Sequence, residues 1–387
     1  MKLVLVNDAS SLRDWMRLPG SIYRQDPNWI PHLKQDVEKV FDPARNKLFQ
    51  GGQAWRWVVY DANGTPVGRV AAFINPKTAH TEAQPTGGMG FFECVNDQAV
   101  ANMLLDAARD RLKQEGMQAM DGPINFGEKN MYWGALIENF TDPPIYGVNY
   151  NPPYYPALLE TYGFRLYYKQ LFFKRSMEVK AQPIFHRKFN QMKNDPDYLI
   201  RDARGRSVEQ LADDFMTVYN AGWVDHENFK PMERAAALKI IKAMEPVMDP
   251  RILIFVEHKK VPVAFYISVP EMNEIFRYVN GDLNWIGKLK FLWHKWRGTV
   301  KTMTGIVFGV AKPYQGKGLE GAMIVFAEKI VEAGLYRDTI LTWIGDFNPR
   351  MIKVCVNLDA VNYRTMATYR YLFDRSLPFE RRPIIEK

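Results

Sequence analysis

The chain has 387 residues, and its 47% hydrophobic content excludes a disordered or fibrous protein and supports two domain cores. Its two cysteines, Cys94 and Cys355, are too few for a disulfide framework, which predicts a reducing, cytoplasmic compartment. The formal net charge of +8 favours anionic partners, but no helix-turn-helix, zinc-finger or RNA-binding pattern accompanies it, so nucleic acid is not an expected partner.

The first half of the chain predicts alternating strands and helices around one hairpin. We expect its N-terminal segment to be a strand rather than a signal peptide, because charged residues follow the apolar run too soon. Alternating apolar residues flank the turn at Asn63 and Gly64, which indicates two antiparallel strands. In chain order we expect a strand at 3–6, a helix from about residue 11, hairpin strands at 55–59 and 67–74, a strand at 89–94, a helix at 98–114, a short strand near 122, a helix at 155–162 and strands within 164–173.

The second half repeats this order of elements. We expect a strand at 199–201, helices near 207–219 and 232–247, hairpin strands at 251–257 and 261–269, a strand at 305–310, a glycine loop, a helix to about residue 333, a strand at 339–343, a helix at 348–357 and strands within 361–373. A polar stretch with Pro183 and Pro196 separates the two series. The sequence therefore predicts two fused α/β (α+β) domains, 1–178 and 197–387, joined by a linker at 179–196, each a mixed sheet flanked by helices.

The segment 309–335 is the most informative part of the chain. It runs from an apolar strand through Gly316, Lys317 and Gly318 into an amphipathic helix. Glycine lets the backbone turn its N–H groups towards an anion, and the positive end of the helix favours a phosphate. The loop lacks the Gly-Lys-Ser/Thr ending of a nucleotide P-loop and the third spaced glycine of a dinucleotide fingerprint. An ordinary strand-to-helix turn is the alternative interpretation.

This loop resembles the pyrophosphate loop of the GNAT superfamily of N-acetyltransferases, Gln/Arg-x-x-Gly-x-Gly/Ala, at Gln315 and Gly318. Glu320 stands where Gly or Ala is usual, and Gly321 follows one place later. The order of elements in each half is also that of a GNAT domain. The resemblance implies acyl-CoA as co-substrate, bound in the second domain by Val310, Gln315, Gly316, Lys317, Gly318 and Gly321. The matching segment 93–98 of the first domain has no glycine and two acids nearby, so we expect that domain to shape the acceptor side.

Five segments, 90–97, 121–127, 150–155, 221–232 and 310–320, together resemble a family of fused-GNAT bacterial proteins that includes the bacterial ceramide synthases. The resemblance spans nearly the whole chain. It implies an acyl-CoA-dependent N-acyltransferase that acts on a long-chain (sphingoid) base.

Acyl transfer from a thioester to an amine needs a neutral amine, a stabilised oxyanion and a proton for the departing thiolate. By resemblance, a backbone N–H in the strand 306–311 stabilises the oxyanion. A tyrosine seven residues after an asparagine often protonates the thiolate in this superfamily; here Cys355 stands seven residues after Asn348. The structural alternatives are that Cys355 is a small core residue and that Asn348 only caps its helix.

Several residues are candidates for binding and activating the amine. The candidates for the general base are His226 and Asp225, together with Glu271, Glu274 and Tyr278 after the second hairpin; His226 has a suitable unperturbed pKa. Asn125, Tyr154 and Trp223 are expected to line an acceptor cleft between the domains. A solvated histidine and ordinary structural turns are the alternatives. No metal site is predicted.

The segment 285–302 combines tryptophans with cations. On a helix, Trp285, Leu289, Leu292, Trp293, Trp296 and Val300 would form one apolar face. Trp285, Lys288, Trp293, Lys295, Trp296 and Arg297 are the residues that we expect to contact a membrane. Since no stretch approaches about 18 uninterrupted apolar residues, the prediction is peripheral contact with the inner face of an anionic membrane. An amphipathic helix packed on its own domain is the alternative.

The leading hypothesis is therefore an N-acyltransferase that uses a fatty acyl-CoA and an amphipathic amine. A second hypothesis is an N-acetyltransferase of a soluble amine or amino acid, in which 285–302 merely packs. A third is a non-catalytic fused-GNAT protein, which Glu320 and the missing tyrosine at position 355 favour. The sequence does not indicate the oligomeric state.

Overall fold

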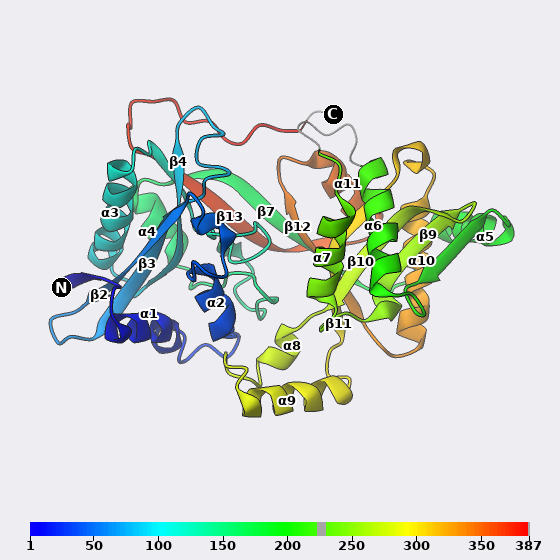
Figure 1. Ribbon diagram of the computed structural model, residues 1–387, viewed down its shortest axis with the longest axis horizontal. Coiled ribbons are helices and arrows are strands. Elements are labelled where there is room, and N and C mark those ends of the chain that lie inside the picture. Colours follow the sequence, from blue (N-terminus) through cyan, green and yellow to red (C-terminus); the bar gives the residue numbers. More distant parts are fainter. Residues whose placement is uncertain (223–229, 386–387) are drawn as a thin grey trace.

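One mixed sheet runs through both halves of the protein in the computed structural model, which describes residues 1–222 and 230–385 (Figure 1). The strands of the described residues are β1 (Lys2–Leu5), β2 (Gln53–Tyr60), β3 (Pro66–Ile74), β4 (Thr86–Cys94), β5 (Ala119–Gly122), β6 (Ala135–Glu138), β7 (Arg165–Ser176), β8 (Tyr198–Asp202), β9 (Leu253–His258), β10 (Val261–Pro270), β11 (Thr302–Val310), β12 (Asp338–Gly345) and β13 (Val361–Leu372).

The helices of the described residues are α1 (Ala9–Ile22), α2 (Lys34–Val40), α3 (Gln98–Gln114), α4 (Tyr155–Tyr162), α5 (Pro183–Asn194), α6 (Val208–Gly222), α7 (Arg234–Met244), α8 (Asn273–Phe276), α9 (Trp285–Trp296), α10 (Leu319–Glu332) and α11 (Pro349–Asn357). Short 3₁₀ turns lie at η1 (Lys47–Phe49), η2 (Pro250–Ile252) and η3 (Lys312–Tyr314).

Strand β3 shows why the first half forms a sheet covered on both faces. Successive side chains of a strand point to opposite faces. Ala71 and Phe73 pack in the cluster that contains Trp15 of α1, whereas Val70 and Ala72 pack in the cluster that contains Leu104 of α3. The helices α1 and α3 therefore cover opposite faces of the same strand.

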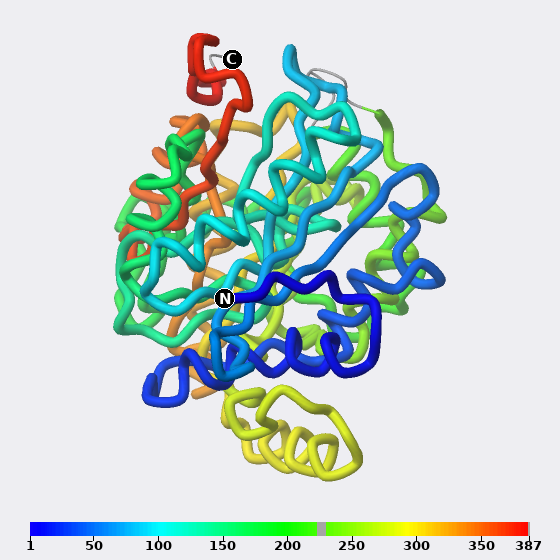
Figure 2. Tube along the Cα trace, turned by 90° about the vertical axis from the view of Figure 1, so that its left-hand side faces the viewer, coloured from blue at the N-terminus to red at the C-terminus, as the bar shows by residue number. Residues whose placement is uncertain are grey.

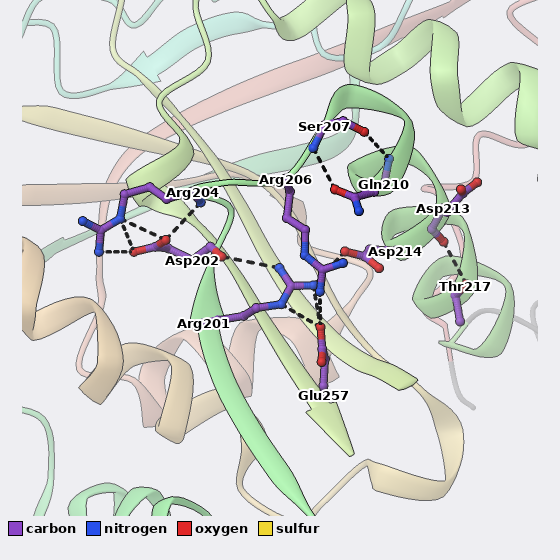
Figure 3. Close-up of polar contacts among 10 residues, drawn as sticks. All are labelled: Arg201, Asp202, Arg204, Arg206, Ser207, Gln210, Asp213, Asp214, Thr217 and Glu257. Carbon is purple, nitrogen blue, oxygen red and sulfur yellow. Dashed lines mark hydrogen bonds and ion pairs between the residues drawn. The ribbon is translucent and has the colours of Figure 1, made fainter. Parts of the chain in front are cut away.

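A charged network fixes the start of the second half (Figure 3). Glu257 on β9 accepts hydrogen bonds from Arg201 Nε at 2.6 Å and from Arg206 Nη2 at 2.8 Å. The same Arg201 donates to Asp214 of α6 at 2.7 Å, so one guanidinium links β8, β9 and α6. Ser207 and Gln210 exchange backbone and side-chain hydrogen bonds in a capping box, which explains why α6 begins here.

The two halves exchange their last strands. The order in the middle of the sheet is β5-β13-β7-β12, so β13 of the second half pairs with β5 of the first. In return, β7 of the first half pairs with β12 of the second. Figure 1 shows β13, in red, reaching into the first half. The boundaries 1–178 and 197–387 stay a prediction, because each part of the sheet contains a strand from the other segment.

Most predicted elements are present, and the differences have physical reasons. Residues 179–196, expected as a linker, contain α5, whose apolar residues Phe185 and Phe189 pack in a cluster with α10. Short elements such as α2 and β6 were not predicted, because a few residues carry too little periodicity. Helix α9 ends at Trp296, so Val300 lies outside the apolar face expected for it.

Candidate functional site

Strands β11 and β12 separate part-way along their length. They pair in parallel only over 302–305 and 338–341. Directly after Gly305, Ile306 is an extra residue in β11, because the register with β10 passes from Ser268–Gly305 to Ile267–Val307. A cavity of about 310 Å³, here the β11–β12 cavity, opens at this point. Its lining comes from β10, β11, β12 and the start of α11 and includes Tyr266, Phe308, Leu341 and Asn348.

Beyond residue 305, β11 no longer pairs with β12, and its backbone has free hydrogen-bond donors on that edge. The Ala311 N–H donates to the Val263 carbonyl at 2.8 Å. Since the direction of backbone groups alternates along an antiparallel ladder, the N–H groups of Phe308 and Val310 point away from β10. The side chain of Gln315 donates to the Val310 carbonyl at 3.1 Å, so the structure brings these two predicted residues together.

The glycine loop leaves the N-terminus of α10 without a side-chain cap. Gly316 and Gly318 have φ values of 73° and 84°, in the left-handed region that glycine tolerates best. Gly318 is the N-cap of α10, and no side chain accepts a hydrogen bond there. Lys317 lies over the ring of Tyr314, 4.9 Å from its centroid, beside this helix end. Uncapped N–H groups, the helix dipole and a nearby cation together suit an anion such as a phosphate.

Helix α5 flanks this loop. A Cβ added at Gly321 would lie 2.0 Å from the ring of Phe185, and one at Gly318 would lie 3.1 Å from the side chain of Lys188. Packing against α5 therefore explains why Gly321 has no side chain. In the part of the chain that the structure describes, the open positions of the loop are Gln315, Gly316 and Lys317, which are exposed.

A second cavity, of about 340 Å³, lies on the other face of the sheet, where the loop 142–145 meets α8. Glu271, Glu274, Tyr278 and Ile340 are among its lining, and we call it the Glu271 cavity. Ile340 shares a face with its register partner Thr304. Thr339, bonded to the Tyr266 hydroxyl at 2.6 Å, is on the opposite face. The two cavities therefore approach the separation of β11 and β12 from opposite sides.

Glu271 is a buried carboxyl, 5% exposed. Its Oε1 accepts hydrogen bonds from the backbone N–H groups of Tyr146, at 2.7 Å, and Asn273, at 3.0 Å. Its Oε2 accepts one from Thr304 Oγ1 at 2.8 Å. Burial outweighs these bonds and raises the pKa of Glu271 to about 7. A carboxyl with this pKa can accept a proton near neutral pH.

Helix α9 projects from the body beside the Glu271 cavity (Figures 1 and 2). Its inner side is held by Phe291, stacked on Phe276, and by His294, stacked on Tyr278 at 4.0 Å between ring centroids. Its outer side exposes large apolar residues: Trp285 (72%), Leu289 (58%), Leu292 (59%), Trp293 (53%) and Trp296 (79%). The alternative of an apolar face packed on its own domain is therefore wrong.

The fold and the chain as a whole resemble known proteins, although no protein-family model matches the chain. It is 24% identical to the bacterial ceramide synthase of Caulobacter vibrioides, over 95% of this chain and 97% of that protein. It is also 24% identical to Protein YghO of Escherichia coli, over 94% and 93% of the two chains.

Among solved structures, the fold is similar to a tandem GNAT protein from the clavulanic acid biosynthesis pathway, with a TM-score of 0.56, 12% identity and coverage of 97% of this chain and 99% of that chain. The chain has the tandem GNAT fold. A glucosamine N-acetyltransferase region in a fungal multi-domain β-N-acetylglucosaminidase also has a TM-score of 0.56 at 12% identity; the match covers 96% of this chain and 38% of the fungal chain. These findings confirm the predicted fold class and the resemblance to bacterial ceramide synthase.

Asn348 and Cys355, the two residues predicted to help protonate the thiolate, have different surroundings in the structure. Asn348 lines the β11–β12 cavity and caps α11, accepting a hydrogen bond from the Met351 N–H at 3.2 Å. Cys355 is fully buried with Phe173, Ile344 and Ala360, outside the cavity lining. Burial raises the pKa of the Cys355 thiol to about 12. The structure therefore gives Cys355 the position of a core residue.

The first half lacks the open separation seen between β11 and β12. Strands β4 and β5 also diverge after Gly88, but the residues that follow β5 in the chain, around Ile124, fill the gap between them. The Ile124 N–H donates to the Met89 carbonyl at 2.7 Å, and a Cβ at Gly90 would lie 1.8 Å from the Ile124 oxygen. Asn125, in this segment, is 3% exposed and does not line either cavity.

The structure does not bring the remaining predicted site residues together in one place. The Tyr154 hydroxyl donates to the Cys94 carbonyl at 2.8 Å, a structural contact of the first half. Glu274 lines the Glu271 cavity and accepts a hydrogen bond from the Lys301 N–H. His226, Asp225 and Trp223 lie outside the described residues. Within 1–222 and 230–385, no helix has the length and apolarity to cross a membrane, and no cluster of three metal-ligating side chains is present.

Proposed function

We propose that this protein is an acyl-CoA-dependent N-acyltransferase that acylates a long-chain (sphingoid) base at a membrane surface. The observation that carries the proposal is the separation of β11 from β12, which opens the β11–β12 cavity along the strand that leads into the glycine loop and the uncapped N-terminus of α10. The tandem GNAT fold and the similarity to bacterial ceramide synthase support an acyltransferase.

The donor half of the proposed site is built from β11 and the glycine loop. The N-terminus of α10 with Gly316, Lys317 and Gly318 would hold the pyrophosphate of acyl-CoA. The thioester would lie in the β11–β12 cavity, where an N–H of Phe308 or Val310 can donate to the developing oxyanion. The proposal therefore keeps acyl-CoA with the second half of the chain.

The acceptor half approaches from the opposite face through the Glu271 cavity. Glu271 takes a proton from the ammonium or from the attacking amine, the amine nitrogen bonds to the thioester carbon, and the carbon–sulfur bond breaks. The thiolate takes its proton from water, because the buried Cys355 does not reach the cavity. Among the candidates for the base that the sequence offered, the proposal takes Glu271.

Helix α9 supports a lipid acceptor. Tyr278 lines the Glu271 cavity and stacks on His294 of α9, so the proposed acceptor site adjoins the exposed tryptophan face. With 3.6 residues per turn, Lys288 and Lys295 lie on one flank of that face, and Lys290 and Arg297 on the other. An apolar strip between two cationic flanks suits the interface of an anionic membrane.

The proposed function predicts a defined product. The purified protein, incubated with acetyl-, medium- and long-chain acyl-CoA and a bacterial lipid extract, should form N-acylated long-chain bases detectable by mass spectrometry. Acetylation of small soluble amines alone would favour an N-acetyltransferase of soluble substrates. Failure to form any amide would favour a non-catalytic protein.

Gly318→Val should weaken CoA binding by about tenfold or more, because a Cβ obstructs the close approach of backbone to pyrophosphate. Isothermal calorimetry with CoA measures the change. Valine is also strained at the φ of +84° of Gly318. Gly205→Val is the matched control, since Gly205 has a φ of +78°, open space around it and a position outside the glycine loop. Equal CoA affinity in both folded variants would remove the loop from the proposed site.

A further inference from the structure

The acyl-transfer proposal does not use a cavity that lies where the first half meets the segment before α9. The cavity measures about 980 Å³ and lies between α1, α2 and the segment 279–284, which leads into α9. Figures 1 and 2 both show α1 and α9 in the lower part of the molecule. The apolar lining of this cavity includes Met16, Trp29, Ile30 and Val37. Its charged lining includes Arg13, Arg17 and Arg69. We call it the α1–α2 cavity.

A buried guanidinium forms part of its wall. Arg69 is 4% exposed, and its Nη1 donates to the Trp15 carbonyl at 2.8 Å. Its Nη2 lies 3.5 Å from Glu93 Oε1, and its buried Nε has no hydrogen-bond partner. Buried guanidinium groups normally satisfy their donors, so Arg69 has donor capacity that the protein leaves unused.

Charged groups of both signs line the cavity: the cations are Arg13, Arg17, Lys34 and Arg69, and the carboxyls are Glu38, Glu93 and Asp282. Glu93 accepts hydrogen bonds from the hydroxyls of Tyr23, at 2.7 Å, and Tyr155, at 2.8 Å. Burial raises the pKa of Glu93, whereas the charge of Arg69 and these hydrogen bonds lower it. The pKa of His32 falls to about 3, through burial and then the charge of Arg69, so His32 adds no charge.

The mouth of the cavity adds further positive charge. Arg13 and Arg17 are one helical turn apart on α1, both exposed and both part of the lining. Neither forms an ion pair with any described residue. Guanidinium groups at the mouth and in the wall, with apolar side chains between them, suit an amphipathic ligand with a phosphate group.

We propose that the α1–α2 cavity binds the phosphate head group of an anionic membrane lipid, with Arg13 and Arg17 at its mouth and Arg69 within. The site adjoins the proposed acceptor site, because Ile30 lines both this cavity and the Glu271 cavity, but it does not include Glu271 or the glycine loop. Only the source of the lipid rests on the proposed membrane contact of α9. The binding itself is independent of acyl-CoA and of Glu271.

Short-chain lipids below their micelle concentration test the site without a membrane. Calorimetry should show that the protein binds dihexanoyl phosphatidic acid at least tenfold more tightly than inorganic phosphate or dihexanoyl phosphatidylcholine. Arg13→Ala with Arg17→Ala should weaken this binding by about tenfold or more, the scale of lost charge-assisted hydrogen bonds. Lys39→Ala with Arg45→Ala removes the same charge from exposed positions outside the lining and should leave binding unchanged.

A cavity-filling variant keeps the test independent of charge. Gly20 on α1 is part of the lining, and a Cβ there would meet no atom within 4 Å. Gly20→Phe should therefore fold normally and block the lipid, whereas Gly20→Ala should bind it. Equal binding of phosphatidic acid and inorganic phosphate would assign a free phosphate ligand and overturn the lipid proposal. Undiminished lipid binding in Gly20→Phe and in the double arginine variant would place the lipid elsewhere.

Discussion

Glu271→Gln should lower the rate of acyl transfer by about 10²-fold or more, the usual scale for a lost general base. The amide can keep the local structure, since its oxygen can still accept from the Tyr146 and Asn273 N–H groups and the Thr304 hydroxyl can rotate to accept. Steady-state kinetics should therefore show a lower kcat with little change in KM. Glu274→Gln, in the same cavity, is the matched control and should retain most of the activity.

The pH dependence separates a base from a structural residue. A base must be deprotonated, so the activity of the native protein should rise with pH through about 7, the folded pKa of Glu271. Glu271→Gln should not show this rise in activity.

The pKa shift also affects stability, and its sign can be checked. The folded pKa of Glu271 lies above the unfolded value of about 4.5. Protonated Glu271 therefore adds to the free energy of unfolding below pH 4.5, and this contribution, on the order of 3 kcal/mol, is lost as the pH rises through about 7. Thermal unfolding of Glu271→Gln should lack that loss. A variant with native kcat and an unchanged pH profile would exclude Glu271 as the base.

Replacing Lys288, Lys290, Lys295 and Arg297 of the α9 region with glutamate should release the protein from anionic vesicles. Each basic residue near such a surface contributes about 1 kcal/mol, so losing four attractions lowers partitioning by roughly 10³-fold, and reversal lowers it further. Co-sedimentation with vesicles at low and high salt measures the change, since salt screens this attraction. CoA affinity should stay unchanged, because the glycine loop lies elsewhere.

A matched control keeps the net charge equal. Glutamate at Lys2, Arg45, Lys47 and Lys77, four exposed cations of the first half, changes the total charge by the same amount. This control should remain bound, if α9 rather than overall charge makes the contact. A native protein that ignores anionic vesicles at low salt would refute membrane contact, and the exposed face of α9 would then need a protein partner.

Much of the fold could be read from local patterns. Helices α3 and α4 lie where 3.6-residue periodicity and their end signals predict them, and the hairpin of β2 and β3 follows its Asn63–Gly64 turn. The glycine loop was predicted from Gly316 and Gly318, whose left-handed φ values only glycine adopts easily. These features depend on residues close together in the chain, so the sequence contains enough information to predict them.

The sequence also predicted the amphipathic face of α9, because the spacing of tryptophans and cations is a local property. Whether that face is exposed depends on what packs against it. In the fold, the opposite side of α9, with Phe291 and His294, contacts the body, and the tryptophan face stays exposed. Burial of a helix face is a tertiary property, and the spacing alone left both alternatives open.

The sequence by itself determined the order of elements, the repeat of one plan in two halves and the position of the glycine loop. Only the tertiary structure decided which strands pair, and it placed β7 and β13 in each other's part of the sheet. It also distinguished Glu271 from Glu274 and buried Cys355 away from the cavity. The physical reason is that strand pairing, the desolvation of a carboxyl and the access of a side chain to a cavity depend on contacts between residues far apart in the chain. Local periodicity does not report such contacts.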